Sequence, residues 1–337
     1  MRTLKTASFN VGKIPPAVLL RSVFPFLGKK DSAILVKPGI GRDAAIMRLG
    51  TKVLVFSTDP ITGTTTHIGT HSVIINANDI ATSGARPIWY FCTILLPPGT
   101  KESILRSIMV EIDKASKALG VAVLGGHTEV TAGIGRPILA GFMIGEAEHG
   151  RVLSSEDGRL GDKILLTKTA GLEGTAILAS DHSSRLRHLS HSTIDRARKF
   201  SEQISIVNEA LAVAGLQGVH SMHDPTEGGV LNGLWELAEA SNLGINVWAD
   251  KVRIAPETLE ICSVLHLDPL KLMSSGSLLV AVQPSAAYRV TRKLRRMNVN
   301  VSEVGSLAPK SSGRYLFKNG RKILLRAVPR DELYRLG

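Results

Sequence analysis

The chain has 337 residues, which is long for a single hydrophobic core and predicts two domains. Its apolar fraction of 44% is that of a globular protein and excludes a disordered chain. The net charge of +12 raises the question of nucleic acid, but no aromatic residues are interleaved with the basic clusters to stack on bases. We therefore expect a solvated basic surface, with an acidic partner or an anionic substrate as the alternative.

The sequence contains no membrane or secretory signal. No apolar stretch approaches the roughly 20 residues that cross a bilayer, and the N-terminus lacks an apolar segment with a cleavage site. The two cysteines, Cys92 and Cys262, lie in apolar sequence, as buried free thiols do. These features predict a cytoplasmic protein without a disulfide framework.

Strand and helix patterns alternate along the chain, which predicts an α/β (α+β) fold. The strands expected in the first half are 33–36, 44–49, 52–57, 88–96, 121–124 and 137–146, and the helices are 15–27, 67–83 and 104–119. After a polar linker, the expected strands are 163–167, 219–223, 244–248, 277–282 and 300–304, and the helices are 230–241, 257–265 and 285–297. The expected units are an N-terminal segment (1–34) and two domains (35–147 and 160–337).

The common nucleotide and zinc motifs are missing. The sequence has no G-x-x-x-x-G-K-[ST] segment, which excludes a P-loop. Gly39-x-Gly41-x-x-Ala44 matches a loose dinucleotide fingerprint, but the turn at Gly50 comes too early for the helix that would hold the pyrophosphate. His67 and His71 have the helical spacing of a zinc pair, but no cysteine lies nearby, which disfavours zinc.

Acidic residues in apolar surroundings are the strongest candidates for chemistry. Asp43 follows a glycine-rich turn, Asp59 terminates an apolar strand, and Asn78-Asp79 lies within an apolar helix. An acid in such surroundings is costly to desolvate unless it is paired or bound to a cation. Carboxylate and amide oxygens are ligands of Mg²⁺, which commonly bridges to phosphates. A shared metal–phosphate site is one interpretation, and local capping of turns is the other.

Two glycine-containing turns could hold an anion. Gly125-Gly126-His127-Thr128-Glu129 follows a predicted buried strand, and Asp224-Pro225-Thr226-Glu227-Gly228-Gly229 joins a strand to a helix. Backbone amides in such turns can form an anion nest or a helix N-terminus that binds phosphate. The alternatives are a plain turn for the first and a helix cap at Asp224 for the second. Lys168 and Glu173 are also placed near a strand end.

In their order along the chain, these motifs resemble those of the HypE family, within the AIR synthase superfamily. The matching segments are Gly41-x-Asp43-Ala44-Ala45, Thr58-Asp59-Pro60, Asn76 to Ala81, Gly84 to Pro87, Gly125 to Glu129, Thr167-Lys168, Met222 to Gly229 and Ser274 to Leu279. The resemblance covers residues 12–305 and implies a barrel-like homodimer formed by the N-terminal domain, with ATP bound near the interface. The reaction it implies is transfer of the γ-phosphate, often to an amide-type oxygen; in HypE this converts an S-carboxamide to a thiocyanate for the NiFe-hydrogenase centre.

The resemblance also implies roles for particular residues. Mg²⁺ and the phosphates would be held by Asp43, Asp59, Asn78 and Asp79, with the three aspartates as the catalytic and metal-binding residues. The nucleotide cleft would be lined by Gly125, Gly126, Thr128 and Glu129. The C-terminal domain would contribute Asp224, Thr226 and Gly228, with Lys168 as a further nucleotide-binding candidate.

Two departures from the family pattern limit what is carried over. HypE acts on a cysteine in its own C-terminal Pro-Arg-Ile-Cys, whereas no cysteine follows Cys262 here, so the tail is not expected to carry the thiocyanate. Arg42 stands where the family usually has an acid. The absence of a cysteine near the N-terminus disfavours selenophosphate synthetase. The sequence predicts an ATP-Mg-dependent enzyme acting on a small molecule or a partner's side chain, with a non-catalytic assembly or maturation factor as the alternative.

Overall fold

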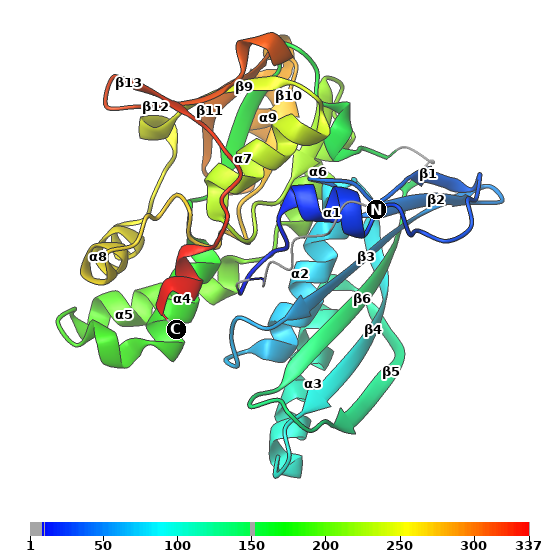
Figure 1. The fold of residues 1–337 in the computed structure, drawn as a ribbon, viewed down its shortest axis with the longest axis vertical. Helices are drawn as coiled ribbons and strands as arrows, with labels where there is room; N and C mark the ends of the chain where they lie inside the picture. Colours follow the sequence, from blue (N-terminus) through cyan, green and yellow to red (C-terminus); the bar gives the residue numbers. More distant parts are fainter. Residues whose placement is uncertain (1–8, 10, 149–151, 337) are drawn as a thin grey trace, which may run out of the picture.

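The computed structural model describes residues 9, 11–148 and 152–336, and its strands form two mixed sheets (Figure 1). The N-terminal sheet contains β1 (Ile34–Val36), β2 (Ala45–Leu49), β3 (Lys52–Ile61), β4 (Arg86–Leu96), β5 (Ala122–Val130) and β6 (Ile138–Glu146). The C-terminal sheet contains β7 (Lys163–Thr167), β8 (Val219–His223), β9 (Gly244–Trp248), β10 (Leu279–Val282), β11 (Val301–Ala308), β12 (Arg314–Lys318) and β13 (Arg321–Leu324).

One α-helix of the described chain precedes the first strand, and the others lie in connections between strands. The N-terminal half contributes α1 (Pro16–Ser22), α2 (Ile68–Thr82) and α3 (Glu102–Leu119). The C-terminal half contributes α4 (Leu172–Asp181), α5 (His191–Arg198), α6 (Val207–Ala214), α7 (Gly229–Ala240), α8 (Pro256–Leu265) and α9 (Pro284–Arg295). The two-domain, mixed α/β architecture predicted from the sequence is confirmed. The limits of the domains stay predictions.

The pairing of strands is mostly antiparallel in both sheets. The strand orders are β1-β2-β3-β6-β4-β5 and β13-β12-β9-β11-β7-β10-β8, with parallel pairing of β4 with β5 and of β9 with β12. The alternation of helix and strand therefore does not produce a parallel sheet here.

The observed strands differ from the predicted ones in two ways. Strands β12 and β13 were not predicted. Strands β3 and β5 extend beyond their predicted ends, so Asp59 and Gly125-Gly126 lie within strands and not after them.

Helix α2 is buried almost all round because it lies between the N-terminal sheet, α3 and the C-terminal domain's α6. Two glycines of β6 allow its close approach to the sheet. A Cβ atom on Gly141 would lie 2.3 Å from Nδ2 of Asn76, and one on Gly145 would lie 2.2 Å from Cγ2 of Ile80. The backbone of β6 therefore forms the surface on which α2 packs.

The two domains share a continuous core. One apolar cluster joins residues of α2 and the first sheet to residues of α6, α9 and β8. Asn78 of α2 adds a polar link: its Nδ2 donates to the Ile204 carbonyl at 2.8 Å, and its Oδ1 accepts from the Ile206 N–H at 2.9 Å. The predicted linker is also packed, since the Ser155 carbonyl accepts hydrogen bonds from Ser221 and Ser241. The two domains are thus fixed relative to one another.

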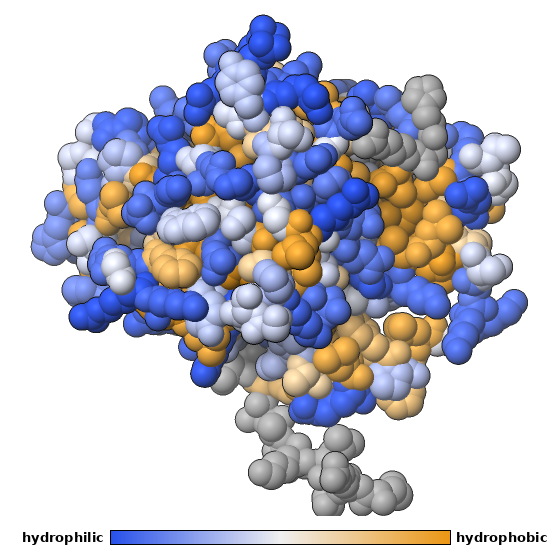
Figure 2. Space-filling view, turned by 90° about the horizontal axis from the view of Figure 1, so that it is seen from above, coloured by the Kyte–Doolittle hydropathy of each residue, from blue (hydrophilic) through white to orange (hydrophobic). Residues whose placement is uncertain are grey.

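Cys92 and Cys262 are free and buried, as the sequence predicted. Within the described residues, none of the helices has both the length and the apolar character that a membrane span requires. On the face seen in Figure 2, hydrophilic residues predominate, and apolar residues gather on the side where Figure 1 places the N-terminal domain.

We expect Gly145→Ala to destabilise the protein by about 1–3 kcal/mol, because the added methyl group overpacks the contact with Ile80. Urea unfolding measures the effect. Gly135→Ala is the matched control, since nothing lies within 4 Å of a Cβ atom there. Equal stability of the two variants would contradict close packing of α2 on β6.

Candidate active site

A cavity of about 760 Å³ lies between the two domains, a size and position common for nucleotide and cofactor sites. The N-terminal side contributes Asp43, Asp59 and Asp79, and the C-terminal side contributes Asp224 and Thr226. A second cavity of about 330 Å³ adjoins it. Residues lining both cavities are Lys13, Asp59, Pro60 and Thr226.

Each of the three predicted catalytic aspartates is brought to the larger cavity by a different element. Asp43 lies in the loop between β1 and β2, Asp59 in β3, and Asp79 in α2. The loop can approach α7 because Gly41 has φ +72° and a Cβ there would lie 2.5 Å from the Glu236 carbonyl oxygen. The prediction that these acids share one site is consistent with this arrangement; their chemical roles stay predictions.

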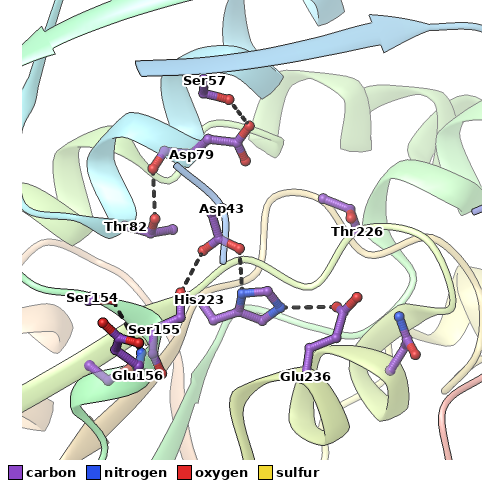
Figure 3. A network of polar contacts seen from close by, with 12 residues as sticks. Asp43, Ser57, Asp79, Thr82, Ser154, Ser155, Glu156, His223, Thr226 and Glu236 are labelled. Carbon is purple, nitrogen blue, oxygen red and sulfur yellow. Dashed lines mark hydrogen bonds and ion pairs between the residues drawn. The ribbon is translucent and has the colours of Figure 1, made fainter. Parts of the chain in front are cut away.

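His223 lies between two carboxylates, as Figure 3 shows. Its Nδ1 forms an ion pair with Asp43 at 2.6 Å, and its Nε2 lies 3.2 Å from Glu236. Burial opposes the charged imidazole, but Asp43 and Glu236 raise the pKa of His223 to about 10. A protonated His223 therefore holds both carboxylates in position at neutral pH.

The remaining acids repel one another in a buried space. Burial raises the pKa of Asp59 to about 6, although Lys13 opposes the shift. Burial and the charges of neighbouring aspartates raise the pKa of Asp79 well above its usual value, while the Ser57 hydroxyl donates to this carboxylate (Figure 3). Burial likewise raises the pKa of Asp224 to about 8. A bound cation would lower all three.

Asp224 provides the clearest indication of a missing partner. Both of its carboxylate oxygens are buried, and neither has a hydrogen-bond partner among the described residues. A buried, unpaired carboxylate is costly unless a cation compensates it. The residues present therefore fit a hard divalent ion such as Mg²⁺.

The protein does not supply a complete metal site alone. Within the described ranges, no three His, Cys, Asp or Glu side chains converge closely enough to hold a metal ion. Mg²⁺ typically binds through one or two carboxylates together with substrate phosphates and water. The acids around this cavity thus suit an ion that arrives with a phosphorylated ligand.

Lys13, which sequence reasoning missed, introduces a positive charge into this acidic surface. Its half-exposed side chain donates to Oγ1 of Thr226 at 3.1 Å and pairs with Glu236 at 3.5 Å. Enclosure lowers the pKa of Lys13, but Glu236 and Glu227 more than offset this and raise the pKa above its ordinary value. No motif indicated Lys13, whereas the position of His223 directly before Asp224 could have indicated His223.

Three other predicted ligands contact the protein itself. Asn78 binds the backbone of residues 204–206, as described above. The Lys168 ammonium donates to the Ser205 and Gly276 carbonyls and pairs with Glu209 at 2.9 Å. The Gly228 N–H, at the start of α7, donates to Asp331 at 2.6 Å. None of the three lines either cavity, and their roles at the nucleotide stay predictions.

The predicted nucleotide residues Gly125, Gly126, Thr128 and Glu129 lie on β5, the exposed edge strand of the first sheet. The register aligns Asp59 with Gly141, Gly141 with Cys92, and Cys92 with Gly126. Three strand spacings place Gly126 about 14 Å from Asp59. Within one chain these residues are therefore separate from the acidic cavity. Hydrogen bonds from Thr131 and His127 lower the pKa of Glu129.

Arg42 lines the larger cavity, and its positive charge is balanced by an ion pair with Glu156. Its guanidinium contacts Glu156 and donates to the Lys37 carbonyl at 2.7 Å. It joins the β1–β2 loop to the segment between the domains.

The fold and site define a two-domain α/β protein with an acidic, nucleotide-sized cavity between its domains. Family models described as AIR synthase related protein match residues 41–147 (N-terminal domain) and 159–317 (C-terminal domain). A hydrogenase expression/formation protein of Methanocaldococcus jannaschii is 32% identical over 272 residues, covering 77% of this chain and 78% of that protein. The chain therefore belongs to the AIR synthase-related family, as a HypE-like member.

Two further similarities agree with this assignment. The carbamoyl dehydratase HypE of Bradyrhizobium diazoefficiens is 30% identical, covering 68% of this chain and 65% of that protein. A crystal structure of hydrogenase maturation protein HypE in complex with ATP has a TM-score of 0.71 at 21% identity, covering 95% of this chain and 96% of that one. The structural likeness shows the shared fold.

We expect Asp224→Asn to stabilise the metal-free protein by about 1–3 kcal/mol at pH 8, because it removes a buried carboxylate without partners. The raised pKa makes the folded wild type bind a proton that the unfolded chain releases, so wild-type stability falls as the pH rises from about 4 to about 8. Urea unfolding in a chelator at pH 5 and 8 should show a smaller fall in the variant. An equal fall in both proteins would contradict the burial of this charge.

Proposed function

We propose that this protein is an Mg²⁺-dependent enzyme that transfers the γ-phosphate of ATP to an amide-type oxygen. The observation that carries the proposal is the unpartnered, buried carboxylate of Asp224 beside Asp43, Asp59 and Asp79 in a nucleotide-sized cavity. Phosphoryl transfer relies mostly on positioning and charge neutralisation, which such a cavity can provide.

The side chains of the cavity take distinct roles in this proposal. Mg²⁺ would be held by one or two of the carboxylates of Asp59, Asp79 and Asp224 together with the phosphates, whose charge it neutralises when bound. Lys13 lies where the two cavities meet and would contact the phosphate being transferred. His223 positions Asp43 through their ion pair and thereby fixes the β1–β2 loop.

The amide-type acceptor is inferred from the relatives. The name carbamoyl dehydratase describes removal of water from a carbamoyl group, and γ-phosphate transfer to the carbamoyl oxygen would make that oxygen a leaving group. We extend this reaction class, but no particular acceptor, to this chain.

We also propose that two copies pair through the first sheet. Helices α2 and α3 cover one face of this sheet, whereas Figure 1 shows no helix on the other. That face carries a row of aromatic rings, with Phe142 between Phe56 and Phe91 at centroid distances of 6.2 and 6.1 Å. A twin subunit would cover these rings, and its β5 could then supply Gly125, Gly126, Thr128 and Glu129 to the nucleotide.

A second candidate function is a nucleotide-binding maturation factor without turnover. The observation that favours it is α9, which buries Ala286, Val290 and Leu294 and presents basic side chains outward. This helix would suit an acidic protein partner.

We expect Asp59→Asn and Asp79→Asn to lower Mg²⁺-dependent ATP turnover by at least about 100-fold, because each removes a charge that faces the metal and phosphates. Release of ADP with and without Mg²⁺ measures the effect. Asp113→Asn, at an exposed ion pair on α3, is the matched control. Unchanged rates in both cavity variants would refute the site, and binding of ATP without turnover by the wild type would favour the maturation factor.

We expect Phe142→Lys to convert a dimer to a monomer, because it places a charge in the centre of the uncovered aromatic row. Sedimentation velocity measures the oligomeric state. Val110→Lys is the matched control, since Val110 is an exposed apolar residue on α3. A monomeric wild type at all concentrations would exclude the proposed pairing.

A further inference from the structure

We propose that the smaller cavity is the acceptor subsite, that it takes a small uncharged amide, and that Glu173 is the residue that binds the amide. This inference rests on the proposed function, because it assigns the larger cavity to the nucleotide. It adds the place of the acceptor, its charge, and a residue that contacts it.

The junction of the cavities is suited to group transfer. Lys13, Asp59 and Thr226 line both spaces, and the Lys13 ammonium is bound there by the Thr226 hydroxyl. A phosphate held by Lys13 from the side of the larger cavity, with Asp59 acting on it through Mg²⁺, would face the smaller one. With a volume of about 330 Å³, the smaller cavity suits a small molecule better than a second nucleotide.

The charges around the smaller cavity disfavour an anion. Its lining contains three carboxyl groups, on Asp59, Glu173 and Glu227, and one ammonium group, on Lys13. An added carboxylate or phosphate would be repelled. Hydroxyl groups complete the polar lining and can both donate and accept hydrogen bonds; they belong to Thr62, Thr64, Ser275 and Tyr334. An amide, with an N–H₂ donor and a carbonyl acceptor, matches this lining.

Glu173 is the carboxyl group available to such a ligand. Glu227 already accepts from the Lys13 N–H at 3.0 Å and from the Tyr334 hydroxyl at 2.8 Å, and Asp59 faces the proposed metal. Glu173 lies in the first turn of α4, is buried at 4% exposure, and lines the cavity. It is therefore placed to meet a ligand and shielded from bulk water.

Burial and the neighbouring carboxyl groups of Asp331 and Glu227 disfavour the charged form of Glu173. His71 Nδ1 lies 3.7 Å from Glu173 Oε1, and neither ring nitrogen of His71 has a hydrogen-bond partner in the described chain. Burial raises the pKa of Glu173 to about 7 and lowers the pKa of His71 to about 4. Near neutral pH, Glu173 can therefore donate to a carbonyl oxygen when protonated or accept from an N–H when ionised.

This placement gives a balanced transfer step. The amide oxygen forms a bond to the γ-phosphorus of ATP while the bond from that phosphorus to the β,γ-bridging oxygen breaks, and ADP leaves. The amide nitrogen loses one proton to the ionised Glu173 carboxylate, and the product is an O-phosphorylated imidate. Glu173 touches the acceptor and would act as the general base.

The test uses benzamide and benzoate, which share a ring and differ in charge, with the full chain at pH 7.5 and without nucleotide. Saturation-transfer NMR should detect benzamide, and binding of benzoate should be weaker by about tenfold or more. Thr62→Phe should abolish benzamide binding by filling the half-buried rim of the smaller cavity. Thr51→Phe, on the exposed turn between β2 and β3, is the matched control.

A second variant tests the assigned residue. Glu173→Met keeps the approximate volume but removes the hydrogen-bonding oxygens, so benzamide binding should fall about tenfold while Mg-ATP affinity, measured by calorimetry, is kept. Equal or tighter binding of benzoate, no benzamide binding, or benzamide binding unaffected by Thr62→Phe or by Glu173→Met would overturn the inference. If the wild type does not bind Mg-ATP, the proposed function is refuted instead. The two failures can be told apart because benzamide binding is measured without nucleotide.

Discussion

Burial of several carboxylates in one cleft is the constraint on which the rest of this structure depends. Like charges in a space with little water raise one another's proton affinity, and the folded chain tolerates them only with nearby positive charge. Lys13 and protonated His223 supply part of that charge, and both contact the carboxylate of Glu236. The negative charge that they leave uncompensated is clearest at Asp224. This charge suits the site to bind a cation together with the phosphates that accompany it.

The scaffold keeps these charges in place through packing that reaches across both domains. Helix α2 holds Asp79 on its cleft side while Asn78, the preceding residue, binds the backbone of the C-terminal domain. A shift between the domains would break these buried hydrogen bonds and open the common core. The geometry of the acids is therefore tied to the stability of the whole chain.

The sequence allowed much of this to be predicted, and the failures have physical reasons. Asp43, Asp59 and Asp79 were predicted together because acids in apolar segments need a partner, and all three line the cleft. Asn78 and Lys168 were assigned to the nucleotide, yet a polar side chain in apolar sequence is equally satisfied by distant backbone carbonyls, which no local pattern reveals. Lys13 depends on long-range contacts and carried no motif, and Glu173 was noted only for its placement near a strand end. Gly125-Gly126 was placed at a strand end because glycine pairs favour turns, although a strand edge also accommodates them.

Glu227 receives hydrogen bonds from the two opposite ends of the sequence, from the Lys13 N–H and from the Tyr334 hydroxyl. The wall of the smaller cavity therefore depends on two segments that lie far from it and from each other in the sequence. A proteolytic cut in either segment would remove one donor from Glu227 and leave this carboxylate less restrained. Sensitivity of the cavity to cleavage at such distant positions is a consequence of closing one wall with two separate segments.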